Sequence, residues 1–282
     1  MPTVNDDYPK NTKMTDEEMK AAAIAQYESK HSDVKSHNFP TEIIELPSKG
    51  IPYPAGHPLK SGTIEMKYMT AKEEDILTNQ SFIKQGVVLD KLFKSLIVTN
   101  VPYDDLLLGD KNAIMLSARI LGYGKHYETK IQTPSGNEQS VVIDLTELTE
   151  KEVDFDLLKD GQMEYEYELP ISKRKIKVRL LDQHAQNKID AEIRGLKKVN
   201  KTASPDLSTR MKHIITSVGG DTDVKLIRDF VDNYLLARDS RALREYIREF
   251  QPDIDMNVTI TSGGEDMVIE LPLGVNFFFP DA

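Results

Sequence analysis

Apolar and polar residues alternate in two short stretches near the start of the folded chain. The stretches are residues 41–46 and 62–69, and the segment between them is dense in proline and glycine. A period of two residues is typical of a strand buried on one face, and segments rich in proline and glycine form turns. We therefore predict a β hairpin with a long connecting loop.

A helical pattern follows. Thr70 and Glu73 have the spacing of a capping box, in which two side chains satisfy free backbone groups at a helix start. Gly86 interrupts this helix. The next helix has apolar residues on one face, at Val88, Leu89, Leu92, Phe93, Leu96 and Ile97. A third helix is predicted at 112–121, with Gly122 as its C-terminal stop.

Hairpins and helices are interleaved in the second half. Strands flank the loop at 133–136, and a second hairpin pairs residues 163–169 with 175–181. Helices are predicted at 182–199, 206–218, 222–237 and 240–250. The second hairpin carries opposite charges on its two strands, at Glu164, Glu166 and Glu168 and at Lys175, Lys177 and Arg179. These charges predict cross-strand ion pairs on an exposed face, each contributing less than about 1 kcal/mol.

Two segments of the chain are alike. Residues 131–145 and 260–271 both read as strand, small-residue turn, acid and strand. Hairpins converge on such turns by chance, whereas a duplicated module would make the chain two related halves. Both interpretations stay open, with duplication slightly favoured.

The pattern as a whole predicts an α+β protein. Residues 1–40 are polar and predict a flexible N-terminal arm, either without a role or ordered by a partner. Residues 41–124 predict a hairpin plus helical domain. Residues 125–282 predict a mixed α+β domain with a C-terminal aromatic tail.

Composition narrows the class of protein. The 282 residues include no cysteine, which excludes disulfides, thiolate zinc sites and cysteine nucleophiles and suits a reducing compartment. The net charge of -10 argues against nucleic acid as the main partner. No apolar run approaches the roughly 18 residues that span a bilayer, and the N-terminus has no apolar signal core. We expect a soluble protein without a membrane partner.

One region is basic. Between Ile171 and Lys212, twelve Lys/Arg stand against four Asp/Glu, a charge of +8 (12 - 4), which leaves -18 (-10 - 8) elsewhere. A solvated face that balances an acidic body is the favoured interpretation, and a docking patch for an acidic neighbour is the alternative. The candidate partner-binding residues of such a patch are Lys173, Arg174, Lys175, Lys177, Arg179, Lys197 and Lys198.

Three consecutive aromatic residues, Phe277, Phe278 and Phe279, are further candidates for partner binding. Docking within the monomer is slightly favoured over an anchor for another subunit. In an extended segment, however, alternate side chains face opposite sides. We therefore predict that at least one of the three meets another surface.

Catalytic constellations are missing from the sequence. The six histidines lie far apart and form no metal-binding spacing, and Ser48 and Ser135 sit in turns rather than in a nucleophile elbow. His126 and His184 could meet a carboxylate in space, but surface or hydrogen-bonded histidine is far commoner. We expect no enzyme activity, no cofactor and no structural metal.

Longer motifs carry a family resemblance. The runs IIELPSKGIPYP, GTIEMKYMTAKEEDILTNQSFIKQGVVLDKLFKSLI and LLLGDKNAIMLSARILGYG, within residues 43–124, resemble the N-terminal half of the T-even-type bacteriophage baseplate hub and hub assembly family. The hairpin at 169–181 and the ending ELPLGVNFFFP are also similar to that family. Its members carry a C-P-x-C-G element where this chain has TPSG and TSGG. Because Thr133, Ser135 and Ser262 cannot replace thiolates, a zinc ribbon is not carried over.

The resemblance implies a role in tail morphogenesis in the host cytoplasm. It leaves open whether the protein stays in the virion, as part of the tail baseplate. We expect a non-enzymatic component that binds other phage baseplate or hub proteins, and a homo-oligomer stays open. The alternative is a transient assembly chaperone absent from the mature virion, and an enzyme acting on the cell wall is a third, unsupported class.

Overall fold

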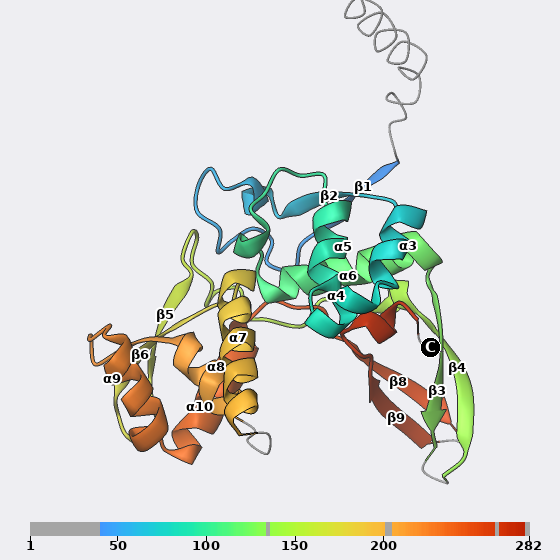
Figure 1. Ribbon diagram of the computed structural model, residues 1–282. Coiled ribbons are helices and arrows are strands. Elements are labelled where there is room, and N and C mark those ends of the chain that lie inside the picture. Colours follow the sequence, from blue (N-terminus) through green and yellow to red (C-terminus); the bar gives the residue numbers. More distant parts are fainter. Residues whose placement is uncertain (1–39, 134–135, 201–204, 263–264, 280–282) are drawn as a thin grey trace, which may run out of the picture. The chain divides into compact units, whose positions relative to one another are not determined.

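The computed structural model describes residues 40–133, 136–200, 205–262 and 265–279 (Figure 1). The predicted N-terminal arm lies outside these residues apart from Pro40, and so does Ser135. Residues from Thr41 onward form one compact α+β unit. None of the described helices combines the length and the apolar character needed to cross a membrane.

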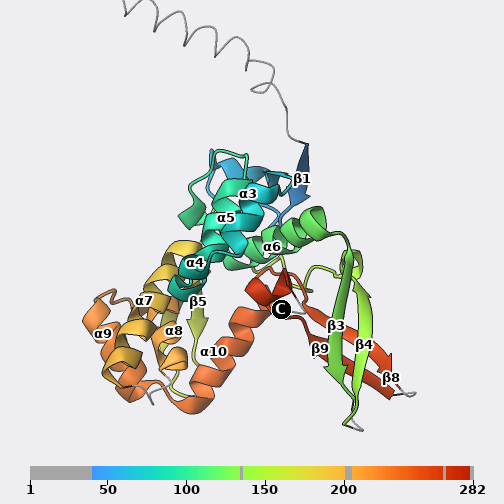
Figure 2. The same ribbon diagram turned by 45° about the vertical axis from the view of Figure 1, so that its right-hand side comes forward.

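The first half is a hairpin followed by helices, as predicted. Strand β1 (Thr41–Glu45) pairs antiparallel with β2 (Thr63–Lys67). Helices α3 (Ala71–Leu77), α4 (Gln80–Gln85) and α5 (Val88–Leu96) lie on one side of α6 (Leu108–Tyr123) in Figures 1 and 2.

Both the capping box and the apolar face of α5 are confirmed. Glu73 accepts hydrogen bonds from the backbone and the hydroxyl of Thr70, at 3.0 and 2.5 Å. On α5, Val88, Leu92, Phe93 and Leu96 are buried. The helix predicted from Thr70 to Gly86 is, however, two helices, because α3 ends at Leu77 and α4 begins after the N-cap Asn79.

Gly122 does not end α6, so that prediction is wrong. The helix continues to Tyr123, and Gly124 is its C-cap at φ 83°. A Cβ added at Gly122 would lie 3.0 Å from the Cε of Met69. Gly122 therefore permits close packing inside the helix instead of a turn.

The second half is built around a three-stranded sheet. Strands β5 (Glu164–Glu168), β6 (Lys175–Arg179) and β7 (Ile215–Val218) lie in that order, all antiparallel. The helices are α7 (Gln183–Val199), α8 (Asp206–Ile214), α9 (Val224–Asp229) and α10 (Ala237–Phe250), and a π-helical turn, η4 (Phe230–Tyr234), follows α9.

Three predicted helix boundaries are corrected here. The helix predicted at 206–218 ends at Ile214, because the β-branched residues after it pair with β6. The helix predicted at 222–237 ends in η4, and the last helix begins at Ala237 instead of Ser240. The helix predicted at 182–199 is confirmed as α7, with Asp182 as its N-cap.

Each half, with the first taken as residues 41–144 and the second as residues 164–270, ends in a hairpin, and both hairpins were predicted. Strand β3 (His126–Gln132) pairs with β4 (Glu138–Asp144), and β8 (Asn257–Ser262) pairs with β9 (Glu265–Glu270). The two hairpins lie side by side in Figures 1 and 2. The predicted domain boundary at 124/125 falls between α6 and β3, and one hydrophobic core continues across it.

The halves share more than their hairpins. In the second half, β6 pairs with β7 through Val178 and Ile215. In the first half, Met66 and Ile97 form an isolated antiparallel bridge at the same place, since Met66 and Val178 are each the fourth residue of their strands. At this position the first half therefore has a single β-bridge, between Met66 and Ile97, and the second half has the strand β7.

A second correspondence joins a helix to a turn in each half. Asp110 and Asp239 are each the third residue of a helix, α6 and α10, and both are fully buried. Each accepts hydrogen bonds from backbone N–H groups in a turn that begins Leu-Pro, after Leu46 and Leu169. These shared features favour the duplicated-module interpretation over chance similarity.

Candidate protein-binding surface

Lys173 and Arg174, in the turn between β5 and β6, and Lys175, the first residue of β6, are exposed, and we call residues 170–175 the basic turn. Two backbone hydrogen bonds of 3.0 Å close it, from Leu169 N to the Arg174 carbonyl and from Lys173 N to the Leu169 carbonyl. Lys173 has a φ of 56°, a left-handed conformation uncommon for a residue with a side chain. The turn is therefore held in one defined shape.

The buried Asp239 on α10 fixes the basic turn through two hydrogen bonds. Its carboxylate accepts the backbone N–H of Ile171 at 2.8 Å and that of Ser172 at 3.0 Å. Burial alone would raise the pKa of Asp239, but these hydrogen bonds outweigh it and hold the pKa below its ordinary value. A buried anion on α10 thus positions three exposed cations.

An aromatic groove adjoins the basic turn. The Arg174 guanidinium lies over the rings of Phe230 and Tyr234, with centroids at 5.4 and 5.8 Å. The groove encloses about 520 Å³ and is lined by Arg174, Lys175, Val218, Gly219, Leu226, Asp229, Phe230 and Tyr234. The side chain of Tyr234 is 56% exposed. Exposed tyrosine beside arginine is typical of the residues that dominate protein–protein binding energy.

The charged faces of β5 and β6 oppose each other as predicted. Glu164, Glu166 and Glu168 pair in register with Arg179, Lys177 and Lys175. Lys177 approaches Glu166 at 3.8 Å, but Lys173 rather than Lys175 approaches Glu168, at 4.0 Å. Within the described residues, no ion pair involves Lys175, so its charge is available to a partner.

The structure brings together only part of the predicted basic patch. Lys173, Lys175 and Lys177 line a second depression of about 600 Å³ with Ser217, Gly219 and Gly220. The Arg179 guanidinium instead forms an ion pair with Asp182, at 2.5 Å. Lys197 and Lys198 lie in the last turn of α7 and line neither depression. The candidate surface therefore consists of the basic turn, Lys177 and the aromatic groove.

The C-terminal phenylalanines pack within the monomer, as the sequence slightly favoured, and the alternative of an exposed anchor is wrong for Phe277 and Phe278. Phe277 and Phe278 are buried against Tyr127 and Tyr123, with ring centroids 5.3 and 6.5 Å apart. Phe279 is partly buried against Tyr123, at 5.7 Å. The prediction assumed an extended segment, but Val275–Phe277 forms a 3-10 turn (η5). The alternation of faces that an extended segment would impose therefore does not apply, and the three rings contact Tyr123 and Tyr127.

Arg119 supports this aromatic cluster. Its guanidinium stands 5.3 Å from the centroid of Tyr123 and 5.7 Å from that of Tyr127. It also donates to the carbonyls of Gly124 and His126, at 3.0 and 3.3 Å. No sequence signal marked Arg119, because its role depends on the turn from α6 into β3.

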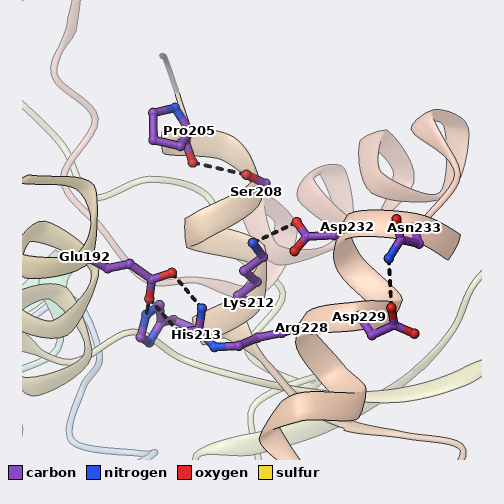
Figure 3. Close-up of polar contacts among 9 residues, drawn as sticks. All are labelled: Glu192, Pro205, Ser208, Lys212, His213, Arg228, Asp229, Asp232 and Asn233. Atoms are coloured by element: carbon purple, nitrogen blue, oxygen red, sulfur yellow. Dashed lines mark hydrogen bonds and ion pairs between the residues drawn. The ribbon is translucent and has the colours of Figure 1, made fainter. Parts of the chain in front are cut away.

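Polar contacts tie together the helices beside the groove (Figure 3). Glu192 on α7 accepts two hydrogen bonds from Arg228 on α9, at 2.7 and 2.6 Å, and contacts Nε2 of His213 on α8 at 2.9 Å. Hydrogen bonds from Arg228 and then from His213 lower the pKa of Glu192 to about 2. Lys212 and Asp232 add an ion pair of 2.7 Å between α8 and η4. These contacts fix the helices that carry the groove.

The other candidates for chemistry lie apart. His126 and His184 are exposed on different elements. Ser48 is buried, and its hydroxyl donates a hydrogen bond to Asp110. In the described ranges, no three His, Asp or Glu side chains are grouped to hold a metal ion.

No protein-family model matches the chain, and no curated protein or solved structure is significantly similar to it.

Proposed function

We propose that this chain is a non-enzymatic protein-binding component of a contractile phage tail baseplate. The observation that carries the proposal is the combination of a rigid basic turn with an exposed aromatic groove. The baseplate context is supported by the motifs within residues 43–124 that resemble the hub and hub assembly family. Binding would occur through buried surface, without covalent chemistry.

The charge of the surface indicates the kind of partner. Lys173, Arg174 and Lys175 place three cations on one turn of a chain whose net charge is -10. Such a concentration of positive charge attracts an acidic surface and speeds the encounter with it. Tyr234 and Leu226 add apolar area beside the cations. We therefore infer that the partner is an acidic baseplate protein with an apolar anchor.

Charge reversal tests this proposal. Replacing Lys173, Arg174 and Lys175 with Glu should lower the association rate with purified baseplate proteins about tenfold or more at low ionic strength. The variant should also lose most of the dependence of that rate on salt. Stopped-flow or surface-based kinetics over a series of ionic strengths measures both quantities.

A second triple variant is the matched control. Replacing Lys188, Lys197 and Lys198 with Glu changes the net charge by the same amount, on exposed positions of α7 away from the groove. We expect this variant to bind nearly as the unmodified chain does. Equal losses in both variants would mean that net charge alone matters, and the basic turn would then be only a solvated face.

A further inference from the structure

In the first half, the extended segment before α6 is paired through backbone hydrogen bonds with another part of the chain. Leu108 N donates to the carbonyl of Leu181 at 3.0 Å, and Gln183 N donates to the carbonyl of Leu106 at 2.8 Å. Leu107 and Asp182 form an antiparallel bridge between these two bonds. The extended segment before α6 is thus paired with the residues at which α7 begins, and both Leu106 and Leu107 are buried.

The second half repeats this segment but leaves it uncovered. Leu235, Leu236 and Ala237 precede Asp239 as Leu106, Leu107 and Leu108 precede Asp110. Leu236 is 47% exposed, whereas its counterpart Leu107 is buried. Among the described residues, Ala237 N and the Leu235 carbonyl do not form the backbone hydrogen bonds that their counterparts form. We call residues 234–237 the open edge.

The same duplication identifies what would fit the open edge. In the first half, the counterpart of Leu181–Gln183 is the segment 69–71, because Asp182 and Thr70 are the N-caps of the helices that follow β6 and β2. Ala71 is exposed. The Met69 carbonyl and Ala71 N form no backbone hydrogen bond within the described part of the chain. We propose that the start of α3 in a second copy of this chain pairs with the open edge.

Polar side chains at the two surfaces are complementary. Asn187 on α7 donates to Asp104 at 3.3 Å across the covered segment of the first half. The counterparts of these two residues are Asp75, five residues after the N-cap Thr70, and Asn233, six residues before Asp239. The donor and the acceptor have exchanged places, so Asn233, whose Nδ2 donates one N–H to Asp229 at 2.7 Å, can donate its second N–H to Asp75 of the second copy.

This contact joins unlike surfaces. The first half of one copy meets the second half of another, so each pair leaves one surface of each kind free. Such heterologous contacts continue into a filament or close into a ring, depending on the rotation between copies. The inference goes beyond the proposed function, since it concerns the chain alone.

Introduced cysteines test the contact, because the chain has no cysteine of its own. Ala71→Cys and Leu236→Cys are made in separate chains, mixed, and treated with a short bis-maleimide. We expect cross-linked heterodimers in the mixture and none from either variant alone. Placing both substitutions in one chain should instead give a ladder of higher oligomers. Circular dichroism confirms that the variants, both at surface positions, are folded.

Val142→Cys provides the matched control. Val142 is 62% exposed on β4, outside the two proposed segments 69–71 and 234–237, and should not cross-link with Ala71→Cys. Cross-linking to Leu236→Cys no greater than this control would overturn the proposal. Light scattering of the unmodified chain that gives only the monomer mass at all concentrations would also overturn it. Both measurements use the purified chain alone, so their failure leaves the baseplate proposal untouched.

Discussion

Phe277→Ala is expected to destabilise the folded chain by about 3–5 kcal/mol. The Phe277 side chain is fully buried, with its ring against Tyr127. Truncation removes the transfer free energy of the ring and leaves a cavity that the surrounding residues fill only in part. The free energy of unfolding in urea measures the loss, provided that its denaturant dependence is unchanged.

Phe279→Ala is the matched control for the tail. Phe279 is only partly buried, so its truncation should cost clearly less than that of Phe277. If Phe277→Ala were as stable as the unmodified chain, the tail would not belong to the core of the monomer. Phe277 and Phe278 would then return as candidates for partner binding.

Asp110→Ala is expected to cost about 3–5 kcal/mol as well, because it leaves buried donors without an acceptor. The carboxylate accepts the backbone N–H of Ser48 at 3.0 Å, its hydroxyl at 2.8 Å, and the hydroxyl of Tyr53 at 2.7 Å. Asp105→Ala, at a half-exposed side chain, is the control and should cost less than about 1 kcal/mol. Equal unfolding free energies for the two variants would contradict this role of Asp110.

Asp110 should also leave a signature in the pH dependence of stability. Burial raises its pKa from the ordinary value of 3.8 to about 6. Between about pH 4 and 6 the unfolded chain has lost this proton while the folded chain keeps it, so the stability from Asp110 falls as pH rises. Asp110→Asn should remove that fall in urea unfolding across the window. An unchanged slope in the variant would assign the pH dependence to other groups.

The strands and helices were largely predictable, because their signals are local. The alternation at 41–46, the capping box at Thr70 and the apolar stripe of α5 each depend on neighbouring residues. Strand β7 was missed because residues 215–218 follow a helix directly and pair with β6, about 40 residues earlier in the chain. Pairing between distant segments overrides local pattern there.

The candidate site was predictable only in part. The sequence singled out Lys173, Arg174 and Lys175 by charge, but their aromatic neighbours Phe230 and Tyr234 follow more than 50 residues later. The burial of the tail had no local signal either, since its partners Tyr123 and Tyr127 lie far back in the chain. One signal was present but weak: a Leu-Leu pair precedes both Asp110 and Asp239 at the same spacing.

The presence or absence of this protein in purified mature particles distinguishes a resident baseplate protein from a transient chaperone. A resident baseplate protein would be present in purified virions in a fixed ratio to other tail proteins. A transient chaperone would be present in assembly intermediates and absent from virions. Either outcome keeps the proposal of protein binding during tail assembly.

Affinity purification during infection is the most direct measurement of that proposal. A tagged chain is recovered from infected cells under native conditions, and the proteins that accompany it are quantified by mass spectrometry. We predict that baseplate proteins accompany the tagged chain and are lost when Lys173, Arg174 and Lys175 are replaced with Glu. Recovery of a folded chain without any tail protein would contradict a role in baseplate assembly.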